Sequence, residues 1–315
     1  MSDPVRIDSH VHIYQTAEEG IAAKEGYEIW EYGPQDKVEF ADVPGTVEDL
    51  LQSMEKSSMD KVVIVNLYVA DEQRAIYRKA LPANLGQSER ERAERDIEAR
   101  VREELLAFNR WACDVSRDHA AITPFVCADV LLFSGEENAA HVRDLAENQG
   151  ARGVKLHGPA EGFFMGDERL WPTYTVCREL GLPVIGHSGP DLGGNGFAEP
   201  RAFGAVLKAF PELPIVLAHM GGATWQQALE IAESYDNAFF DCCEIIEWTR
   251  SRNGPSEPEL AQLIRDIGAE RVMMGSDFPW YDLDQTVDRV MSLPLLSMEE
   301  KEGIIGANAE RILRI

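Results

Sequence analysis

Two histidines separated by one residue lie near the start of the sequence, in the stretch IDSHVHI at residues 7–13. Every second side chain of an extended strand points to the same side, so we expect His10 and His12 to point the same way. Two neutral imidazoles in this arrangement can bind one divalent metal ion. The pattern also fits two half-buried polar residues at a strand end, and the motif taken alone favours neither interpretation.

The positions of other reactive side chains favour metal binding. His157, His187 and His219 each end a short run rich in Val, Ile or Leu, and Asp277 ends another. Together with the first two, five of the seven histidines therefore fall at predicted strand ends. Three imidazoles and a carboxylate are typical Zn²⁺ ligands, and such mixed sites also accept Mn²⁺, Fe²⁺ or Co²⁺.

A divalent ion in such a site lowers the pKa of a bound water toward neutrality, so that hydroxide is available without a strong base. Asp277 is placed to contact the ion and to accept the proton of that water. The pKa of histidine lies near neutral pH, so His219 is suited to act as a general acid or base on the water or the substrate. We therefore predict Asp277 and His219 as catalytic residues.

The elements that must position these side chains are read from the apolar pattern. Short runs rich in Val and Ile recur, and each is followed by a longer stretch with the apolar and charged spacing of a helix. The predicted strands are residues 5–13, 61–67, 121–130, 151–157, 182–188, 214–220, 238–243 and 271–277. Eight such alternations predict an α/β fold, a closed (β/α)8 TIM barrel whose site lies at the C-terminal ends of the strands. A doubly wound open sheet is the alternative, but no GxGxxG motif follows the first strand.

Two insertions interrupt this rhythm, at about residues 14–45 after the first strand and 69–87 after the second. Both follow the C-terminal end of a strand, so we expect them to cap the site. The last helix, in SMEEKEGIIGANAERILRI, begins at a serine cap and is expected to break near Gly306.

Composition limits the classes of function. The 315 residues are expected to form one domain, residues 1–315. The 55 acidic and 30 basic side chains give a net charge of −25, which repels nucleic acid and anionic lipid. No apolar run is long enough to span a membrane, and no signal peptide is apparent, so we expect a cytoplasmic protein. The five cysteines form no CxxC pair and are expected to be reduced.

Several phrases resemble the amidohydrolase superfamily, in particular its amidohydrolase-2 branch. They are the HVH motif of the first strand, GVKLHGP, LAHMGG, GSDFPW and GANAERIL. This branch includes aminocarboxymuconate semialdehyde decarboxylase, resorcylate decarboxylases, lactonases and C–C hydrolases. The resemblance implies that His10, His12, His187 and Asp277 bind one metal ion, most simply Zn²⁺, while His219 contacts the activated water.

Four further residues near the same strand ends are candidate substrate contacts. They are Lys155, His157, Glu244 and Trp280. Some members of the superfamily carry a carbamylated lysine that bridges two metal ions, and Lys155 is the residue in question here. The alternatives for Lys155 are an ion pair with Asp8 or Asp277, and a single-metal site is favoured.

The leading functional hypothesis is a metal-dependent hydrolase acting on an ester, lactone, amide or C–C bond of a small molecule. The alternative is a metal-dependent decarboxylase, a lyase, of an aromatic or dienoic acid, which would use the same ligands. An arginine that clamps the substrate carboxylate would favour decarboxylation, and Arg74, Arg201 and Arg250 follow strand ends. A non-catalytic binding protein is the third hypothesis. A homodimer is compatible with this kind of barrel, but no interface is apparent from the sequence.

Overall fold

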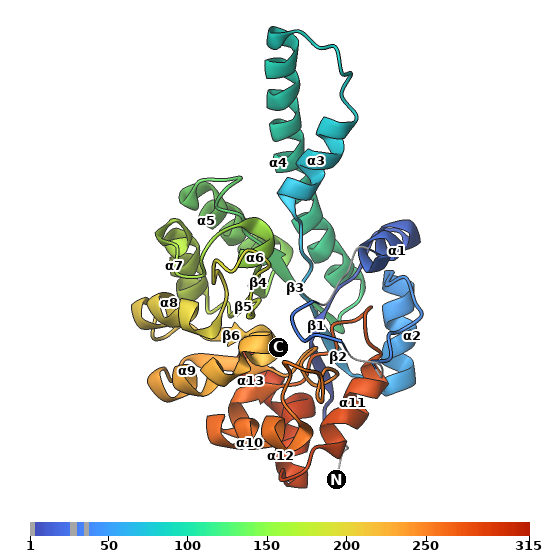
Figure 1. Ribbon diagram of the computed structural model, residues 1–315, viewed down its shortest axis with the longest axis vertical. Coiled ribbons are helices and arrows are strands. Elements are labelled where there is room, and N and C mark those ends of the chain that lie inside the picture. The colour runs from blue at the N-terminus through green and yellow to red at the C-terminus, as the bar shows by residue number, and fades with distance from the viewer. Residues whose placement is uncertain (1–3, 26–29, 35–37) are drawn as a thin grey trace.

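The computed structural model describes residues 4–25, 30–34 and 38–315. At its centre is a parallel sheet of eight strands in the order β1-β2-β3-β4-β5-β6-β7-β8, so each strand pairs with the next one along the chain (Figure 1). The strands are β1 Ile7–Val11, β2 Lys61–Ile64, β3 Ile122–Cys127, β4 Gly153–Leu156, β5 Val184–Gly186, β6 Ile215–Leu217, β7 Ala238–Asp241 and β8 Val272–Met273. Each lies within one of the predicted runs, although the strands are shorter than those runs.

Contacts between the last and the first strand regions close the barrel. The Ser9 N–H donates to the carbonyl oxygen of Met274 at 2.9 Å, and the Asp277 N–H donates to that of His10, also at 2.9 Å. Val11 forms a parallel bridge with Phe278. The predicted TIM barrel is therefore confirmed, and the open-sheet alternative is wrong.

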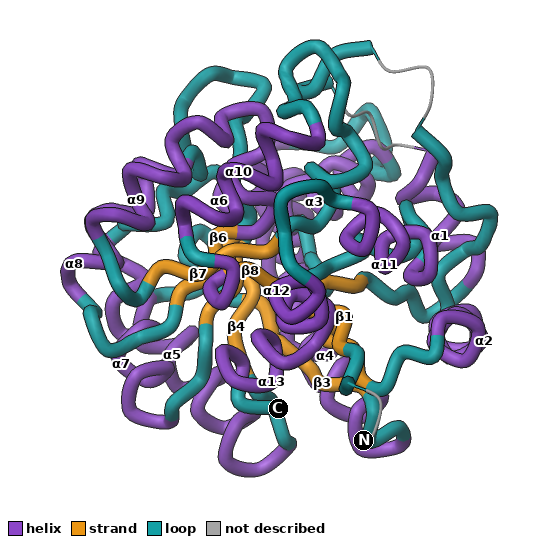
Figure 2. The backbone as a smooth tube through the Cα atoms, turned by 90° about the horizontal axis from the view of Figure 1, so that it is seen from below, coloured by secondary structure: helices purple, strands orange, loops and turns teal. Residues whose placement is uncertain are grey.

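Apolar side chains fill the barrel and its N-terminal end. Ile7, Val63, Phe125 and further strand residues form one buried cluster with Ile312 and others of the last helix. Figure 2 shows that helix, α13, at the lower end of the strands, next to the C-terminus. With this end packed, the opposite end, where the predicted site residues lie, is available for chemistry.

An outer layer of helices covers the strands (Figure 2). Apart from 3₁₀ and π segments, the described helices are α1 Ala17–Glu25, α2 Val47–Ser57, α3 Ala70–Lys79, α4 Gln87–Asp118, α5 Gly135–Asp144, α6 Gly158–Glu161, α7 Trp171–Leu180, α8 Gly204–Ala209, α9 Ala228–Ser234, α10 Glu257–Ile267, α11 Leu283–Ser292, α12 Met298–Glu302 and α13 Asn308–Leu313. None of the helices in the described part of the chain is long and apolar enough to cross a membrane.

The closing helix is interrupted as predicted. Ser297 caps α12, and a π-helical turn at residues 303–307 separates α12 from α13. Gly306 lies in this turn, and a Cβ atom there would be 1.7 Å from the carbonyl oxygen of Val5. A glycine is therefore required for the tail to pack against the start of β1.

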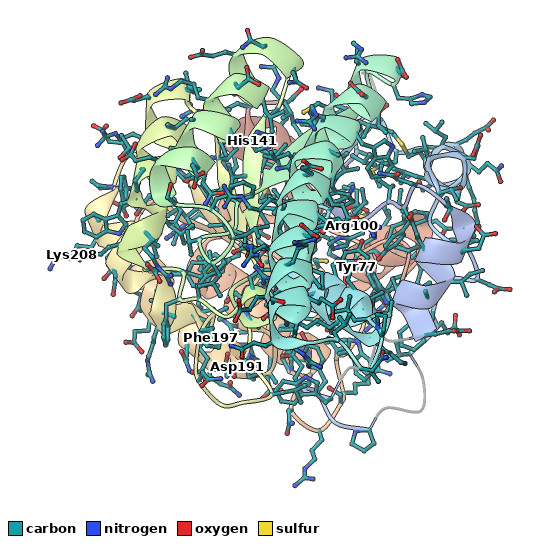
Figure 3. All side chains as sticks on the ribbon, turned by 90° about the horizontal axis from the view of Figure 1, so that it is seen from above. Tyr77, Arg100, His141, Asp191, Phe197 and Lys208 are labelled. Carbon is teal, nitrogen blue, oxygen red and sulfur yellow. The ribbon has the colours of Figure 1, made fainter. Side chains whose placement is uncertain are left out.

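The second insertion forms an arm. Helices α3 and α4 lie side by side and project from the barrel (Figure 1). Ion pairs link them, between Arg74 and Glu98 at 2.8 Å and between Arg78 and Glu94 at 2.8 Å. Tyr77 carries the guanidinium of Arg100 over its ring at 3.9 Å, and Figure 3 shows the two next to each other. This insertion was expected to cap the site. Its tip instead stands away from the barrel.

The first insertion, in contrast, docks on the loops that follow β7 and β8. The ring of Tyr32 stacks on Trp248 with centroids 5.4 Å apart, and the carbonyl oxygen of Tyr32 accepts the N–H of Asn253 at 3.0 Å. The Ala41 N–H donates to the carbonyl oxygen of Trp280 at 2.8 Å. Residues 26–29 and 35–37 of this insertion lie outside the described residues.

Candidate metal centre

Three predicted metal ligands come together beyond the ends of β1 and β8. Oδ1 of Asp277 lies 3.1 Å from Nε2 of His12 and 3.7 Å from Nε2 of His10. One donor atom from each of these residues lies within 4.8 Å of the other two. The histidine rings have centroids 5.3 Å apart, so both side chains point into the barrel mouth.

The ring of His10 is held from both sides. Its Nδ1 atom lies 3.0 Å from Oδ2 of Asp241, the last residue of β7. Its Nε2 atom lies 3.0 Å from Nζ of Lys155 on β4. A carboxylate oxygen accepts and an ammonium group donates, so the hydrogen is on Nδ1 and the Nε2 lone pair faces the mouth. This is the tautomer that a metal ligand requires.

Three further histidines, His157, His187 and His219, continue the cluster around the mouth. The ring centroid of His219 lies 5.0 Å from that of His10 and 4.8 Å from that of His187. His187 stacks on His157 with centroids 4.0 Å apart. His187, the fourth predicted ligand, thus lies beside His219, outside the two groups of closely spaced donor atoms among the described residues.

The backbone at the end of β6 turns sharply at His219. This residue has a φ of 61°, and Met220 and Gly221 that follow have φ values of 49° and 93°. The His219 N–H donates to Oδ1 of Asp241 at 2.8 Å, and Nδ1 lies 3.3 Å from the carbonyl oxygen of Cys243. Because a carbonyl only accepts, Nδ1 carries the hydrogen and Nε2 is free to accept a proton.

Burial sets the charge of these groups. It lowers the pKa values of His10, His187 and His219 below the usual range for histidine, which favours neutral imidazoles. Burial alone would raise the pKa of Asp277, but its hydrogen bond with His12 and the neighbouring imidazoles hold that pKa well below the ordinary value. The centre therefore offers neutral nitrogen donors beside an ionised carboxylate.

These donors fit a divalent metal ion. Neutral imidazole and carboxylate suit Zn²⁺ and also Mn²⁺, Fe²⁺ or Co²⁺. A carboxylate that holds the far nitrogen of a ligating histidine is the usual outer partner of such sites, and Asp241 has this position toward His10. A second group of donor atoms within 4.8 Å of one another consists of His10, Asp241 and Cys243.

The four candidate substrate contacts border this centre. Lys155 lies beside His10, and His157 stacks on His187 while its Nδ1 accepts the N–H of Ala160 at 3.1 Å. Oε2 of Glu244 lies 3.7 Å from Nδ1 of His219. The ring of Trp280 meets His12 edge-on with centroids 5.4 Å apart. The structure thus brings all four to the same mouth.

Three carboxylates near the centre were missed as site residues in the sequence, and two of them, Asp241 and Asp8, are fully buried. Asp241 follows the rule that identified the other ligands, since it ends a strand. Asp8 lies two residues before His10, and its Oδ1 accepts the N–H groups of His10 and Ser276 at 3.0 Å each. Burial raises the pKa of Asp8 to about 7.

The third, Glu31, comes from the first insertion and has no strand-end signal. A Cβ atom on Gly222 would lie 2.6 Å from its Oε1. A Cβ atom on Gly189 would lie 3.1 Å from its Oε2 and 3.6 Å from Nε2 of His187. Two glycines therefore leave room for a carboxyl group of the insertion next to His187, and burial raises the pKa of Glu31 to about 8.

The three arginines considered as carboxylate clamps are engaged elsewhere. Arg74 pairs with Asp71 and Glu98, Arg201 pairs with Glu230, and Arg250 pairs with Glu257.

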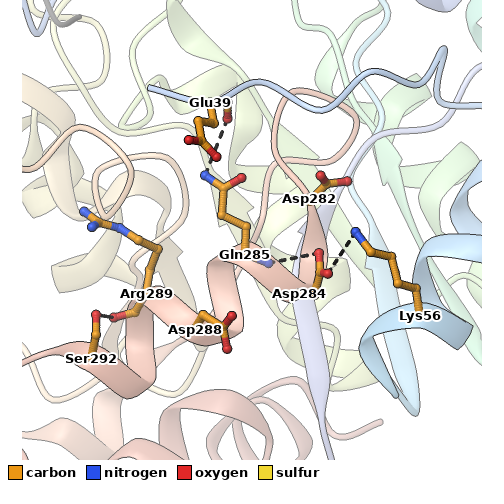
Figure 4. Close-up of a pocket in the computed structure, with 8 residues that line it drawn as sticks. All are labelled: Glu39, Lys56, Asp282, Asp284, Gln285, Asp288, Arg289 and Ser292. Atoms are coloured by element: carbon orange, nitrogen blue, oxygen red, sulfur yellow. Dashed lines mark hydrogen bonds and ion pairs between the residues drawn. The ribbon is translucent and has the colours of Figure 1, made fainter. Parts of the chain in front are cut away.

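A cavity of about 530 Å³ lies on the outer surface between α2, α11 and the loop at Glu39 (Figure 4). It is lined by charged and polar residues, and none of the predicted site residues borders it.

A protein-family model matches most of the length of the chain. The family model described as Amidohydrolase matches residues 7–315. A curated relative from Dictyostelium discoideum, 2-amino-3-carboxymuconate-6-semialdehyde decarboxylase, is 23% identical over 208 residues. The match covers 56% of this chain and 57% of the relative, so the chain spans little more than half the length of the curated relative it matches.

Solved structures share the fold over the whole chain. A 2,6-dihydroxybenzoate decarboxylase bound to 2,6-dihydroxybenzoate has a TM-score of 0.69 and 12% identity, with 99% of each chain covered. A dihydroxybenzoic acid decarboxylase from Polaromonas sp. JS666, with bound manganese and the inhibitor 2-nitroresorcinol, has a TM-score of 0.66 and 14% identity. That comparison covers 98% of this chain and 97% of the other.

Proposed function

Because the chain belongs to the amidohydrolase family, we propose that it is a metal-dependent decarboxylase of a small aromatic or dienoic acid. The observation that carries this proposal is the group of donor atoms from His10, His12 and Asp277 at the barrel mouth. The curated relative and the two solved structures described above are decarboxylases, which supports the choice of reaction.

The metal ion would be held by His10, His12 and Asp277, with His187 as the fourth ligand proposed from the sequence. When bound, a divalent ion supplies positive charge that holds the substrate's carboxylate or a neighbouring oxygen and offsets its negative charge. Zn²⁺ was the first choice from the sequence, and the manganese in the Polaromonas structure makes Mn²⁺ an equally good candidate.

Decarboxylation requires a proton donor as well as a binding site for the substrate acid. The bond between the substrate carbon and its carboxyl carbon breaks, CO₂ leaves, and the electron pair that stays on the carbon takes up one proton. Asp277 is the first group that would move a proton between solvent or substrate and that carbon. His219, with Nε2 as an acceptor, is the second group that can exchange protons there.

The remaining candidates serve to orient the substrate. Lys155 brings an ammonium group to the mouth beside His10, and this group would pair with a substrate anion. The ring of Trp280 would pack against an unsaturated substrate, and His157 and Glu244 would offer hydrogen bonds.

Hydrolysis, the leading hypothesis from the sequence, uses the same ligands. No relative described above is a hydrolase by name, and therefore the comparisons favour decarboxylation. One assay separates the two reactions.

The purified protein, loaded with Mn²⁺ or Zn²⁺, should be incubated with dihydroxybenzoates and with dienoic acids while CO₂ release is measured. Parallel reactions with lactones and esters should be followed by acid production. CO₂ release that is lost in Asp277→Asn supports the proposal. Turnover of lactones or esters without CO₂ release from any acid would instead establish hydrolysis.

A further inference from the structure

A single buried carboxylate connects two parts of the proposed centre. Asp241 is fully buried at the end of β7. Its Oδ2 lies 3.0 Å from Nδ1 of His10. Its Oδ1 accepts the N–H of His219 at 2.8 Å and the N–H of Cys243 at 3.3 Å. One oxygen of Asp241 thus contacts the His10 ring, and the other accepts backbone N–H groups.

On the His10 side, the carboxylate selects the tautomer. Only the form with hydrogen on Nδ1 can donate to Asp241, and this form leaves the lone pair of Nε2 toward Asp277. The position of Lys155 supports the same assignment independently, because an ammonium group 3.0 Å from Nε2 can only donate to it.

On the His219 side, the carboxylate holds the backbone. The residues from His219 to Gly221 all have positive φ values, a conformation that residues other than glycine rarely adopt. The N–H of buried His219 donates to Oδ1 of Asp241. Removing that acceptor would leave the N–H unpaired and would release the turn that aims the His219 ring.

We propose that Asp241 is a positioning residue that ties the metal ligand His10 to the proton-transfer residue His219. This inference rests on the proposed function for the roles of the two histidines. Asp241 itself touches neither metal nor substrate in this scheme, and it acts through the orientation of both rings.

Asparagine at this position cannot accept hydrogen bonds from both neighbours. Its side chain has one acceptor oxygen and one NH₂ donor. If the oxygen stays with the N–H groups of His219 and Cys243, the NH₂ group faces Nδ1 of His10. His10 must then accept at Nδ1 and carry its hydrogen on Nε2, where it cannot bind a metal ion.

Asp241→Asn is therefore expected to reduce metal affinity by about 10–100-fold while the protein stays folded. Affinity should be measured by titration with Co²⁺, followed by its visible absorption, and the fold by circular dichroism. The matched control is Asp129→Asn. Asp129 is also buried after a strand, and its Oδ1 accepts the N–H groups of Leu131 and Leu132 at 2.7 and 3.1 Å. This control should retain full Co²⁺ affinity.

A double-variant cycle tests whether Asp241 acts through His10. In a His10→Ala background, Asp241→Asn should cause little further loss of Co²⁺ affinity, because the ring it orients is gone. An undiminished further loss would overturn the proposal, as would wild-type affinity in the single variant.

The tautomer can also be read without any substitution. In the ¹⁵N-histidine NMR spectrum of the metal-free wild-type protein, His10 should show hydrogen on Nδ1 and a bare Nε2. Hydrogen on Nε2 would overturn the inference even if Asp241→Asn failed to fold. This measurement does not depend on the reaction catalysed, so it distinguishes a failure of the inference from a failure of the proposed decarboxylation.

Discussion

Nζ of Lys155 lies 3.0 Å from Nε2 of His10, the nitrogen that a metal ion at this centre would need. An ammonium group and a divalent cation repel each other strongly at such a separation. Metal binding therefore requires Lys155 to move, to lose its proton or to react with CO₂ to form a carbamate. Burial lowers the pKa of Lys155, which makes loss of its proton easier.

Replacing this lysine distinguishes the single-metal site from the carbamate-bridged site. In the single-metal case, Lys155→Met removes a competing cation, and affinity for Co²⁺ should rise by about tenfold or more. The measurement is a Co²⁺ titration of metal-free protein. A fall in affinity, together with a stimulation of wild-type metal binding by bicarbonate, would instead establish a carbamate ligand.

The histidines of β1 should be essential for the metal. His10→Ala and His12→Ala each remove a nitrogen donor next to Asp277, and each is expected to weaken binding by more than the roughly 10–100-fold typical of outer partners. Metal content after dialysis, measured by elemental analysis, checks this. Full metal content in the His10→Ala/His12→Ala protein would remove the proposed centre from this end of the barrel.

His219 should affect turnover more than metal binding. The side chain lies beside the donor group but outside it, so His219→Ala should retain the ion and lower kcat by about 100–10,000-fold. Metal content and CO₂ release are measured on the same preparation. Equal kcat in variant and wild type would exclude a role in proton transfer.

The stability of the fold should depend on pH through His141. This residue lies on α5 and is not one of the residues of the candidate metal centre. Its Nε2 is 3.2 Å from Nδ2 of Asn109, and burial lowers the pKa of His141 to about 4. In the unfolded chain the imidazole takes up its proton near pH 6.5. The unfolded state therefore binds more protons between these values, and the free energy of unfolding should fall as the pH drops from about 7 to 4.

Urea unfolding at pH 7 and pH 5 measures this contribution. His141→Gln removes the titrating group, so the variant should lose less stability than the wild type over this interval. An equal loss in both proteins would show that other groups cause the pH dependence.

The barrel and most of the cluster could be predicted from the sequence because both depend on local pattern. Runs of Val and Ile mark the strands, and parallel strands carry whatever follows them to the same end of a barrel. His10, His12 and Asp277 meet for this reason. Asp241 was missed although it also ends a strand, because its contact with Nδ1 of His10 joins residues that are distant in sequence.

The rest depends on contacts between distant segments. The docking of Tyr32 on Trp248 follows from the closed barrel and has no local signal. The same holds for Glu31, whose position is visible only through the space at Gly189 and Gly222. The arm of α3 and α4 is stabilised by ion pairs between its own helices, so charge pattern alone did not distinguish it from a cap.

The contact between β1 and the segment after β8 also constrains how the protein is made. His10 and His12 leave the ribosome early, whereas Asp277 follows only after almost the whole barrel has been synthesised. The nascent chain therefore exposes two unpaired imidazoles throughout elongation. In the proposed scheme, the metal ion would therefore bind late in biogenesis, when the last strand joins the barrel.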